Sequence, residues 1–287
     1  MSLQVLTIQS HVVAGHVGND AAAFTLQRLG IEAWPIHTVQ FSNHTGHGAW
    51  TGQAFAAAHV RELVDGLDAR GLLEREDAVL SGYIGSAETG EAIADAVSRV
   101  KAQNPSALYC CDPVMGDVGR GVFVKPDVPE FFAKTALGIA DIITPNVFEL
   151  GLLTGTDSQT QRELIAAARL LLHRGARGAS IAIITSARTE AENRIATLAV
   201  TADAAWAVTT PYLPLDPMPN GMGDCIAALF LARYLQHRDI ALALAQAVSS
   251  LYAIVQGTDA AMPRDLNLIA MQDQLVNPDQ HFDAVIL

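Results

Sequence analysis

The sequence predicts an α/β protein in which helices cover both faces of a mainly parallel central sheet, and three observations lead to this prediction. Short apolar runs rich in β-branched residues alternate with longer amphipathic runs rich in Ala and Leu, and no unit repeats at a fixed period. Strands that alternate with helices favour parallel pairing. Hydrophobic residues make up 50% of the 287, which is enough for a large core without disulfides or metals. No linker-like break in composition interrupts the chain, so we expect a single domain over residues 1–287.

The expected elements follow these runs in order. Strands are expected over the apolar runs at residues 3–8, 33–41, 78–80, 107–111, 141–144 and 181–185. Helices are expected over the amphipathic runs at 20–29, 54–69, 88–102, 161–173, 225–236 and 240–256. Thr160 and Glu163 have capping-box spacing, and Gly30 and Gly175 stand where glycines end helices. The runs 195–201 and 205–210 flank a short turn and predict a hairpin, or flap, at one edge of the sheet.

The composition argues against several classes of partner. A formal net charge of -12 repels a phosphate backbone, so we expect no nucleic-acid partner. No apolar stretch approaches the roughly 18 residues of a membrane span, and residues 1–8 lack the basic start of a signal peptide. Cys110, Cys111 and Cys225 have no metal-type spacing and are interpreted as reduced core thiols. We therefore expect a cytoplasmic protein that does not contact a membrane.

Distinctive polar residues follow the ends of the expected strands. They are Ser10 after the first strand, Tyr83 after the third, Asp112 after the fourth, Asn146 and Glu149 after the fifth, and Thr185 and Ser186 at the close of the sixth. The carboxyl ends of parallel strands meet at one crevice, where ligands of open α/β sheets bind. Each of these residues alone could be an ordinary polar loop residue, but their joint placement predicts one ligand site.

A Gly-Met-Gly-Asp segment, residues 221–224, leads into the amphipathic run that starts at Cys225. Glycines let backbone amides approach an anion, and a helix N-terminus adds free N–H groups and a favourable dipole. Asp224 by itself would be explained as an acid that stabilises the start of a helix. Beside an anion site it has a second interpretation, as the base that takes a proton from a hydroxyl attacking a phosphoryl group.

Other signatures of nucleotide or metal binding are missing from the sequence. There is no G-x-x-x-x-G-K-[ST] loop, and residues 15–18 do not form a G-x-G-x-x-G turn. His44 and His47 are three residues apart without a third ligand at metal spacing, so we interpret them as loop or substrate-facing groups and not as zinc ligands. Cys110 and Cys111 have no His base nearby in sequence, which argues against a nucleophilic role.

The order of these motifs resembles that of the pyridoxal kinases. Residues 8–13 (Ile-Gln-Ser-His-Val-Val), 15–19 (Gly-His-Val-Gly-Asn) and 39–46 (Val-Gln-Phe-Ser-Asn-His-Thr-Gly) match the amino-terminal signature of that family. Residues 111–117, 144–150 and 221–224 then follow in the family's order. The resemblance extends over nearly the whole sequence, as far as His281 and Phe282.

This resemblance implies a ribokinase-like three-layer α/β/α fold, usually a homodimer, with ATP and pyridoxal bound along the crevice. By position, the pyridoxal ring would be surrounded by Ser10, Val17, Phe41, Thr45, Gly46 and Tyr83. The ATP phosphates and Mg²⁺ would be organised by Asp112, Asp117, Thr144, Asn146 and Glu149, with Asp112 and Glu149 as the metal ligands, partly through water. The nucleotide would also meet Thr185, Ser186, Thr209, Thr210, Pro211 and Tyr212.

The resemblance also implies a mechanism. Asp224 would take the proton from the 5′-hydroxymethyl group, while Gly221 and Gly223 present amides to the transferred phosphoryl group. Residues 118–125, with Gly119 and Gly121 as flexible points, resemble the family's loop that closes over ATP. These roles predict ATP-dependent phosphorylation of pyridoxal to pyridoxal 5′-phosphate with Mg²⁺ as cofactor, and they leave a monovalent cation as an open alternative.

The sequence departs from the family at Thr185, where many bacterial relatives carry Lys, and at Met222, where a small or β-branched residue is common. The first departure leaves open which group contacts the nucleotide phosphate there. Two other functions also stay open: a kinase of hydroxymethylpyrimidine or another small molecule on the same fold, and a non-catalytic protein that binds pyridoxal or its phosphate. One sequence does not resolve the selectivity among pyridoxal, pyridoxine and pyridoxamine.

Overall fold

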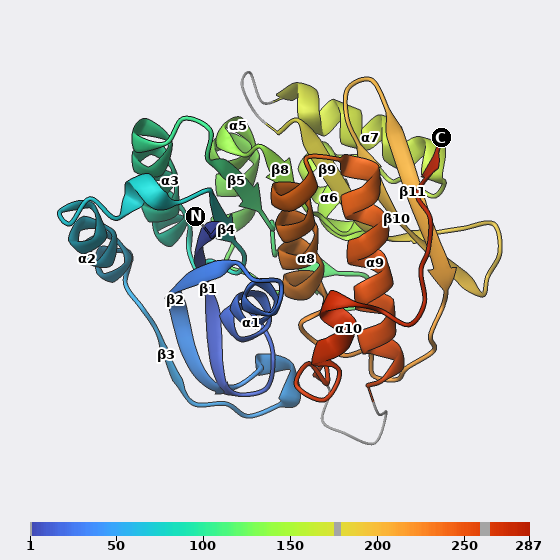
Figure 1. The fold of residues 1–287 in the computed structure, drawn as a ribbon, viewed down its shortest axis with the longest axis horizontal. Helices are drawn as coiled ribbons and strands as arrows, with labels where there is room; N and C mark the ends of the chain where they lie inside the picture. The colour runs from blue at the N-terminus through green and yellow to red at the C-terminus, as the bar shows by residue number, and fades with distance from the viewer. Residues whose placement is uncertain (1, 175–178, 259–264) are drawn as a thin grey trace.

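One sheet runs through the protein and takes strands from both ends of the chain (Figure 1). The computed structural model describes residues 2–174, 179–258 and 265–287. The ten strands lie in the order β12-β11-β10-β9-β8-β5-β4-β1-β2-β3. Their bounds are β1 Gln4–Ala14, β2 Glu32–Asn43, β3 Gly52–Ala54, β4 Ala78–Ser81, β5 Leu108–Cys111, β8 Ile142–Ile143, β9 Ile181–Arg188, β10 Arg194–Val200, β11 Ala205–Pro211 and β12 Val285–Ile286. Pairing is parallel from β2 to β9 and antiparallel at both edges, so the sheet is mainly parallel as predicted.

Helices cover the sheet on both faces, and this confirms the predicted three-layer α/β/α fold. Their bounds are α1 Asn19–Arg28, α2 Ala57–Asp68, α3 Ala87–Gln103, α4 Val128–Phe131, α5 Leu137–Ile139, α6 Val147–Thr154, α7 Gln161–Arg174, α8 Met222–His237, α9 Ile240–Gln256 and α10 Gln272–Val276. Because side chains alternate along a strand, Leu6 and Ile8 belong to the core that includes residues of α2, α3 and α7, whereas Val5 belongs to the core that includes residues of α1, α8 and α9. Helices α8 and α9 lie side by side in front of the sheet in Figure 1.

Several local predictions are confirmed. Helix α9 has the predicted bounds, and the Thr160 hydroxyl accepts from the Glu163 amide at 3.3 Å while the Glu163 carboxylate accepts from the Thr160 amide at 2.9 Å. Gly30 follows α1 with φ 77°, the left-handed conformation expected of a glycine that ends a helix. The prediction for Gly175 falls outside the described residues. The three cysteines are buried free thiols, as expected of core residues.

The first two strands are longer than predicted, and this changes the setting of Ser10. Strand β1 does not end at Ile8 but continues to Ala14, so Ser10 lies within the strand and not after it. The pairing of β1 with β4 stops at Ile8 and Ser81, whereas its pairing with β2 continues to Ala14. The polar residues beyond Ile8 therefore stay in strand conformation because β2 alone supplies the ladder.

Other boundaries also differ from the prediction. Residues 52–54 form the edge strand β3 beside β2, so the helix expected from residue 54 begins only at Ala57. Strand β9 continues to Arg188, which places Thr185 and Ser186 inside it and not at its end. The predicted hairpin of β10 and β11 forms, but the terminal strand β12 pairs outside it and provides the edge. These misses share one cause, because pairing with another strand decides where each element ends.

Short elements between the expected ones were not predicted. A π-helical turn over Phe132–Ala136 joins α4 and α5. Helix α6 begins with a capping box in which Asn146 and Glu149 each accept from the other's backbone amide at 2.9 Å. The residues 116–122 form a two-stranded hairpin of β6 Gly116–Asp117 and β7 Gly121–Val122. That hairpin makes up most of the segment 118–125, which we expected to be a closing loop.

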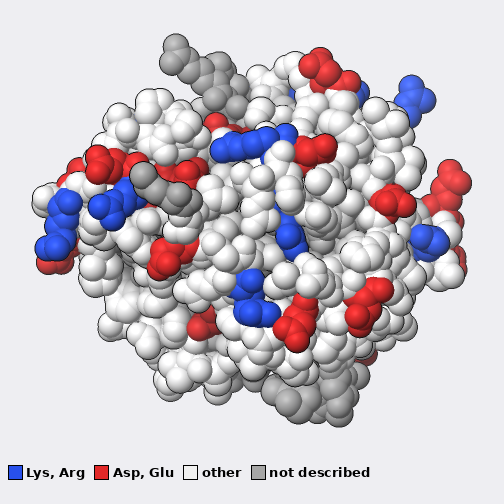
Figure 2. Space-filling view, in the orientation of Figure 1, with Lys and Arg blue, Asp and Glu red and all other residues white. Residues whose placement is uncertain are grey.

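Charged side chains are spread over the surface. On the face drawn in Figure 2, Lys and Arg lie interspersed with Asp and Glu among the described residues, without one large area of a single sign. Among the described helices, none combines the length and the apolar character that crossing a bilayer requires.

Glu76 is a fully buried acid at the end of the sheet that lies away from the crevice. It precedes β4, and its Oε1 accepts from Nε2 of Gln4 at 2.8 Å. Burial is the main cause that raises the pKa of Glu76 from 4.5 to about 7. An acid whose pKa is raised in the folded state costs stability once it ionises, so this cost grows between the two pKa values as pH rises.

We therefore predict that Glu76→Gln raises the free energy of unfolding at about pH 8 and changes it little at about pH 4. At about 1.36 kcal/mol per pKa unit, the gain at the higher pH is on the order of 3 kcal/mol. Urea unfolding of both proteins at the two pH values measures the difference. The exposed neighbour Glu74 provides the control variant, Glu74→Gln. Equal stabilisation at both pH values would contradict the proposed ionisation.

Candidate active site

A tight turn begins helix α8 at the middle of the crevice. Gly221 is the N-cap residue with φ 87°, and a Cβ on it would lie 2.1 Å from the carbonyl oxygen of His16. Only glycine fits this conformation and this contact. The helix begins at Met222 and not at Cys225 as predicted, so residues 222–224 form its first turn. The amide N–H groups of a first turn have no acceptor within the helix and can receive an anion.

Asp224 lies in this first turn and is half-buried. Burial is the main cause that raises its pKa above the ordinary value. Hydrogen bonds from the backbone N–H groups of Gly18 and of Asp224 itself oppose the shift, whereas the nearby charge of Asp20 adds to it. A carboxylate with a raised pKa is a stronger base than a free aspartate, so Asp224 is suited to take a proton.

Two further acids lie close to Asp224. Asp112 directly follows β5 as predicted and is 5% exposed, and its Oδ1 accepts from the hydroxyl of Thr144 at 3.0 Å. Its Oδ2 would lie 3.7 Å from a Cβ on Gly223, so this oxygen faces the helix start. Burial raises the pKa of Asp112 well above the ordinary value, and repulsion from Glu149 and Asp224 raises it further.

Glu149 holds together the segments around this acid cluster. Its Oε1 accepts from the amide of Met115 at 2.9 Å, and its Oε2 accepts from the amide of Asn146 at 2.9 Å. Burial is the main cause that raises the pKa of Glu149 to about 7, and these backbone N–H groups limit the shift. The nearby charge of Asp117 raises it as well.

The donor set fits Mg²⁺ bound mainly by substrate phosphates. Within the described residues, no group of at least three His, Cys, Asp or Glu side chains is arranged to hold a metal ion. Mg²⁺ in nucleotide sites needs only one or two carboxylates, because phosphates and waters supply its other ligands. Asp112 and Glu149 are buried oxygen donors that repel each other, and a divalent cation would relieve that repulsion. Both oxygens of Glu149 already accept backbone N–H groups, so a water between Glu149 and the metal suits this site.

A cavity of about 210 Å³ opens beside Gly223. Its wall contains seven of the residues predicted to meet ATP: Asp117, Asn146, Thr185, Ser186, Thr210, Pro211 and Tyr212. Apolar side chains that were not predicted complete the wall, among them Met218, Met222, Leu251, Tyr252 and Val255. Thr209, which was also predicted to meet ATP, is not among the residues of this wall. A polar end and an apolar end are what a nucleotide requires.

The residues expected around the pyridoxal ring lie on the other side of the helix start. A Cβ on Gly18 would lie 2.4 Å from Oγ of Ser10, so the Ser10 hydroxyl faces the loop 15–18. Val17 is packed within 3.6 Å of the Cβ position of Gly221. Phe41 packs against Trp50 with ring centroids 4.1 Å apart and the ring planes tilted by 40°. Tyr83 is half-buried, which raises its pKa. Ser10 and Val17 lie near Asp224, since Gly18 lies beside Ser10 and donates to that acid.

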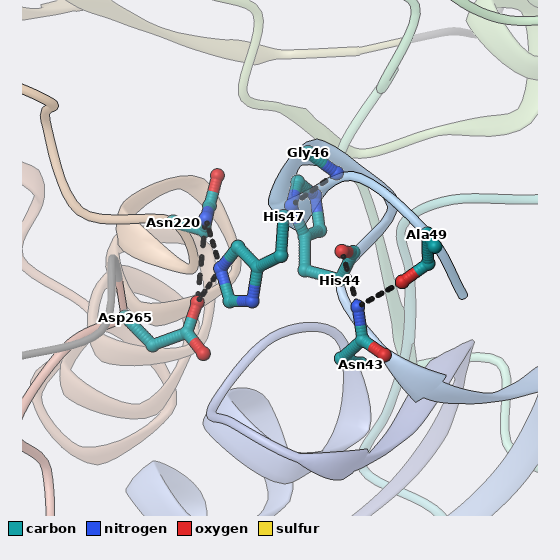
Figure 3. Close-up of polar contacts among 7 residues, drawn as sticks. All are labelled: Asn43, His44, Gly46, His47, Ala49, Asn220 and Asp265. Atoms are coloured by element: carbon teal, nitrogen blue, oxygen red, sulfur yellow. Dashed lines mark hydrogen bonds and ion pairs between the residues drawn. The ribbon is translucent and has the colours of Figure 1, made fainter.

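Thr45, Gly46 and His47 form a single 3₁₀ turn between β2 and β3. The β6–β7 hairpin reaches this turn, because a Cβ on Gly46 would lie 3.0 Å from Nη2 of Arg120. Burial is the main cause that lowers the pKa of His44 to about 4, and the charges of Arg120 and His47 lower it further. The neutral His44 ring accepts from the amide of Gly46 through Nδ1 at 3.2 Å (Figure 3).

Comparison with known proteins agrees with this arrangement. The family model described as phosphomethylpyrimidine kinase matches residues 72–264. A curated relative from Deinococcus radiodurans, named pyridoxal kinase PdxY, is 51% identical over 98% of this chain and 95% of its own. The relative of the same name from Rubrobacter xylanophilus is 48% identical over 98% and 96%.

Solved structures agree as well. A pyridoxal kinase from Leishmania donovani in complex with ADP and pyridoxamine superposes with a TM-score of 0.91 at 28% identity over 99% of both chains. The pyridoxal kinase from Entamoeba histolytica gives a TM-score of 0.90 at 26% identity over 100% of both. The fold is therefore ribokinase-like, as predicted. The identity and the matched length place this chain in the pyridoxal kinase family, among the proteins that the phosphomethylpyrimidine kinase model describes.

Proposed function

We propose that this protein transfers the terminal phosphoryl group of ATP to the 5′-hydroxymethyl group of pyridoxal. The observation that carries the proposal is the position of Asp224, a base with a raised pKa in the first turn of α8, where the nucleotide cavity at Gly223 meets the loop 15–18 beside Ser10. A base there can take the proton of a hydroxyl as the hydroxyl attacks a phosphoryl group. The Leishmania donovani kinase that binds ADP together with pyridoxamine or pyridoxine supports the same assignment.

The mechanism depends mainly on positioning and on charge. The Asp224 carboxylate accepts the proton of the 5′-hydroxyl, and the amides of residues 221–224 stabilise the negative charge that develops on the transferred group. Asp112 and Glu149 would hold Mg²⁺, partly through water, and the ion would supply positive charge to the ATP phosphates. Asp117, Thr144 and Asn146 support that end of the site.

The nucleotide and the pyridine ring bind on opposite sides of Asp224. Thr185, Ser186 and the segment 210–212 line the nucleotide cavity, and its apolar wall suits an adenine ring. The pyridine ring is held by Ser10, Val17, Phe41, Thr45, Gly46 and Tyr83. Arg120 of the β6–β7 hairpin lies beside Gly46. We also propose that the active form is a cytoplasmic homodimer in which each chain forms one catalytic domain.

A kinase of hydroxymethylpyrimidine is the second candidate, because the matching family model carries a pyrimidine kinase description. Both substrates present a hydroxymethyl group on an aromatic nitrogen ring, so Asp224 would serve either one. A non-catalytic binder is a weaker candidate, since it has no use for a base beside a phosphate site.

We predict that the purified protein phosphorylates pyridoxal with ATP, and that removing Mg²⁺ with a chelator stops turnover because the phosphate charge is then uncompensated. Product formation across pyridoxal, pyridoxine, pyridoxamine and hydroxymethylpyrimidine measures the preference. Restored turnover after excess Mg²⁺ is the control for the chelator. A clear preference for hydroxymethylpyrimidine over all three vitamers would favour the second candidate.

We predict that Ser10→Ala raises the KM for pyridoxal by about 2- to 12-fold, the net value of one hydrogen bond, and leaves the KM for ATP unchanged. Steady-state kinetics with each substrate varied in turn measures both constants. The exposed Ser106 precedes β5, away from the crevice, and Ser106→Ala is the matched control. A selective rise in the KM for ATP would reverse the assignment of the two ends.

We predict that Asp224→Asn lowers kcat by about 10² to 10⁴, the range for losing a positioned proton acceptor, with little change in substrate affinity. Asp239 offers a matched control, because it caps α9 by accepting from the Leu242 amide at 3.0 Å and lies outside the site. Asp239→Asn should therefore leave kcat unchanged. Measurements of kcat, pyridoxal binding and the thermal midpoint show whether Asp224 acts as the base or only stabilises the start of the helix. A folded Asp224→Asn variant with near wild-type turnover would exclude Asp224 as the base.

A further inference from the structure

His47 forms a contact across the crevice that the proposed mechanism does not use. Its Nε2 lies 3.3 Å from Oδ1 of Asp265 and 3.2 Å from Nδ2 of Asn220. The Asn220 amide also lies 3.3 Å from the same carboxylate oxygen (Figure 3). The side chains of His47 and Asp265 are 18% and 8% exposed, so water is largely excluded from the pair. Two groups from distant parts of the sequence, His47 and Asn220, therefore meet at the carboxylate of Asp265.

The hydrogen-bonding chemistry assigns the donors. A carboxylate only accepts, and burial raises the pKa of Asp265 while His47 and Asn220 lower it. We place the proton of His47 on Nε2, so that the ring and the Asn220 amide both donate to Oδ1 of Asp265. Two donors satisfy an acid that would otherwise be buried at considerable cost.

Each partner of Asp265 belongs to a different part of the site. His47 ends the 3₁₀ turn that carries Thr45 and Gly46. Asn220 precedes Gly221, the N-cap of α8, and pairs with Asp265 through an isolated parallel bridge. The other oxygen of Asp265 faces the loop 15–18, because a Cβ on Gly15 would lie 2.2 Å from Oδ2. Asp265 therefore contacts the turn, the helix start and the loop that donates to Asp224.

The hydrogen bonds that Asn43 and His44 make at the turn are local. Asn43 closes its base by donating from Nδ2 to the carbonyls of His44 and Ala49, both at 3.2 Å. The His44 and His47 rings are in edge contact with centroids 5.8 Å apart. These bonds hold the turn in shape but do not fix it relative to α8. In Figure 3 the His47 ring spans the space between the turn and the pair Asn220–Asp265.

We propose that His47 is a positioning residue, which fixes the turn 45–47 against the start of α8 through Asp265 and so sets how the pyridine ring presents its hydroxymethyl group to Asp224. The inference rests on the proposed function, because it concerns the vitamin side of the same site. The nucleotide cavity lies on the other side of the helix start, and its wall includes neither His47 nor Asp265. Loss of the contact should therefore affect pyridoxal and not ATP.

The test compares two replacements at one position. His47→Ala removes the donor, whereas His47→Gln keeps an N–H donor near the place of Nε2. We expect His47→Ala to raise the KM for pyridoxal about tenfold, since a hydrogen bond to a charged group is lost, with the KM for ATP within about twofold of wild type. His47→Gln should recover most of the loss. The exposed His237 ends α8 about 22 Å from its start, so His237→Ala is the matched control.

A double-mutant cycle tests whether His47 acts through Asp265. Because the two residues share one contact, His47→Ala combined with Asp265→Ala should raise the KM for pyridoxal no more than Asp265→Ala alone. Additive losses, equal rises in both KM values, or a His47→Gln variant as impaired as His47→Ala would each overturn the proposal. If Asp265→Ala does not fold, the two His47 replacements decide the question alone.

Hydrogen exchange separates this inference from the proposed function. The backbone amides of residues 45–48 and 220–223 should exchange faster in His47→Ala than in wild type without any substrate present, and the amides of β4 should not change. A wild-type protein that does not phosphorylate pyridoxal would refute the function and leave this measurement valid. Unchanged exchange at both segments would refute the proposal that His47 fixes the turn 45–47 against the start of α8, whatever the substrate.

Discussion

The contact between Gly221 and the carbonyl of His16 is the constraint on which the rest of the site depends. A side chain at position 221 would collide with that carbonyl, and the residue needs a φ of 87°. The glycine therefore lets the loop 15–18 lie directly on the start of α8. Gly18 can then donate to Asp224, and the end of β1 that carries Ser10 comes close to the same acid. Without this close approach, the base and the vitamin pocket would belong to separate surfaces.

The charges of three acids determine what the phosphate end of the site can bind. Asp112, Glu149 and Asp224 are buried or half-buried acids whose pKa values are all raised, mainly by burial. Repulsion from the other two acids raises the pKa of Asp112 further. Such a cluster costs stability when it is ionised, and a proton or a cation relieves that cost. In a site that binds magnesium with a nucleotide, the ion would relieve the repulsion among these carboxylates, and this relief would strengthen its binding.

The sequence was informative where the signal was local and repeated. Alternating apolar runs predicted the layers, and the apolar strand before Asp112 placed that acid correctly at a strand end. The capping box of Thr160 and Glu163 was also recognised from spacing alone. The same spacing occurs at Asn146 and Glu149, but the two residues were interpreted as ligands of the nucleotide and of Mg²⁺ and not as a capping box, and helix α6 was missed. Glu149 serves the fold as well, since its carboxylate accepts backbone N–H groups from two segments, residues 115–116 and Asn146.

What could not be predicted depends on contacts between distant segments. Strand β1 continues past Ile8 only because β2 pairs with it, so its polar second half gave no strand signal. Asp20 beside Asp224, Arg120 beside Gly46 and Asp265 beside His47 are each brought together by the fold, and no pattern in the chain marks them. The apolar wall of the nucleotide cavity was missed for a similar reason, because Met222 and Leu251 look like ordinary core positions in their helices.

The most direct test of this account is a crystal structure of the protein with pyridoxal and a non-hydrolysable ATP analogue. The account predicts that the 5′-hydroxyl lies about 2.6 to 3.2 Å from the Asp224 carboxylate, with the terminal phosphate at the amides of residues 221–224. The adenine ring should lie in the cavity beside Met222 and Leu251. A complex in which the hydroxyl faces Asp112 or Asp20, with Asp224 engaged only at the helix start, would contradict it.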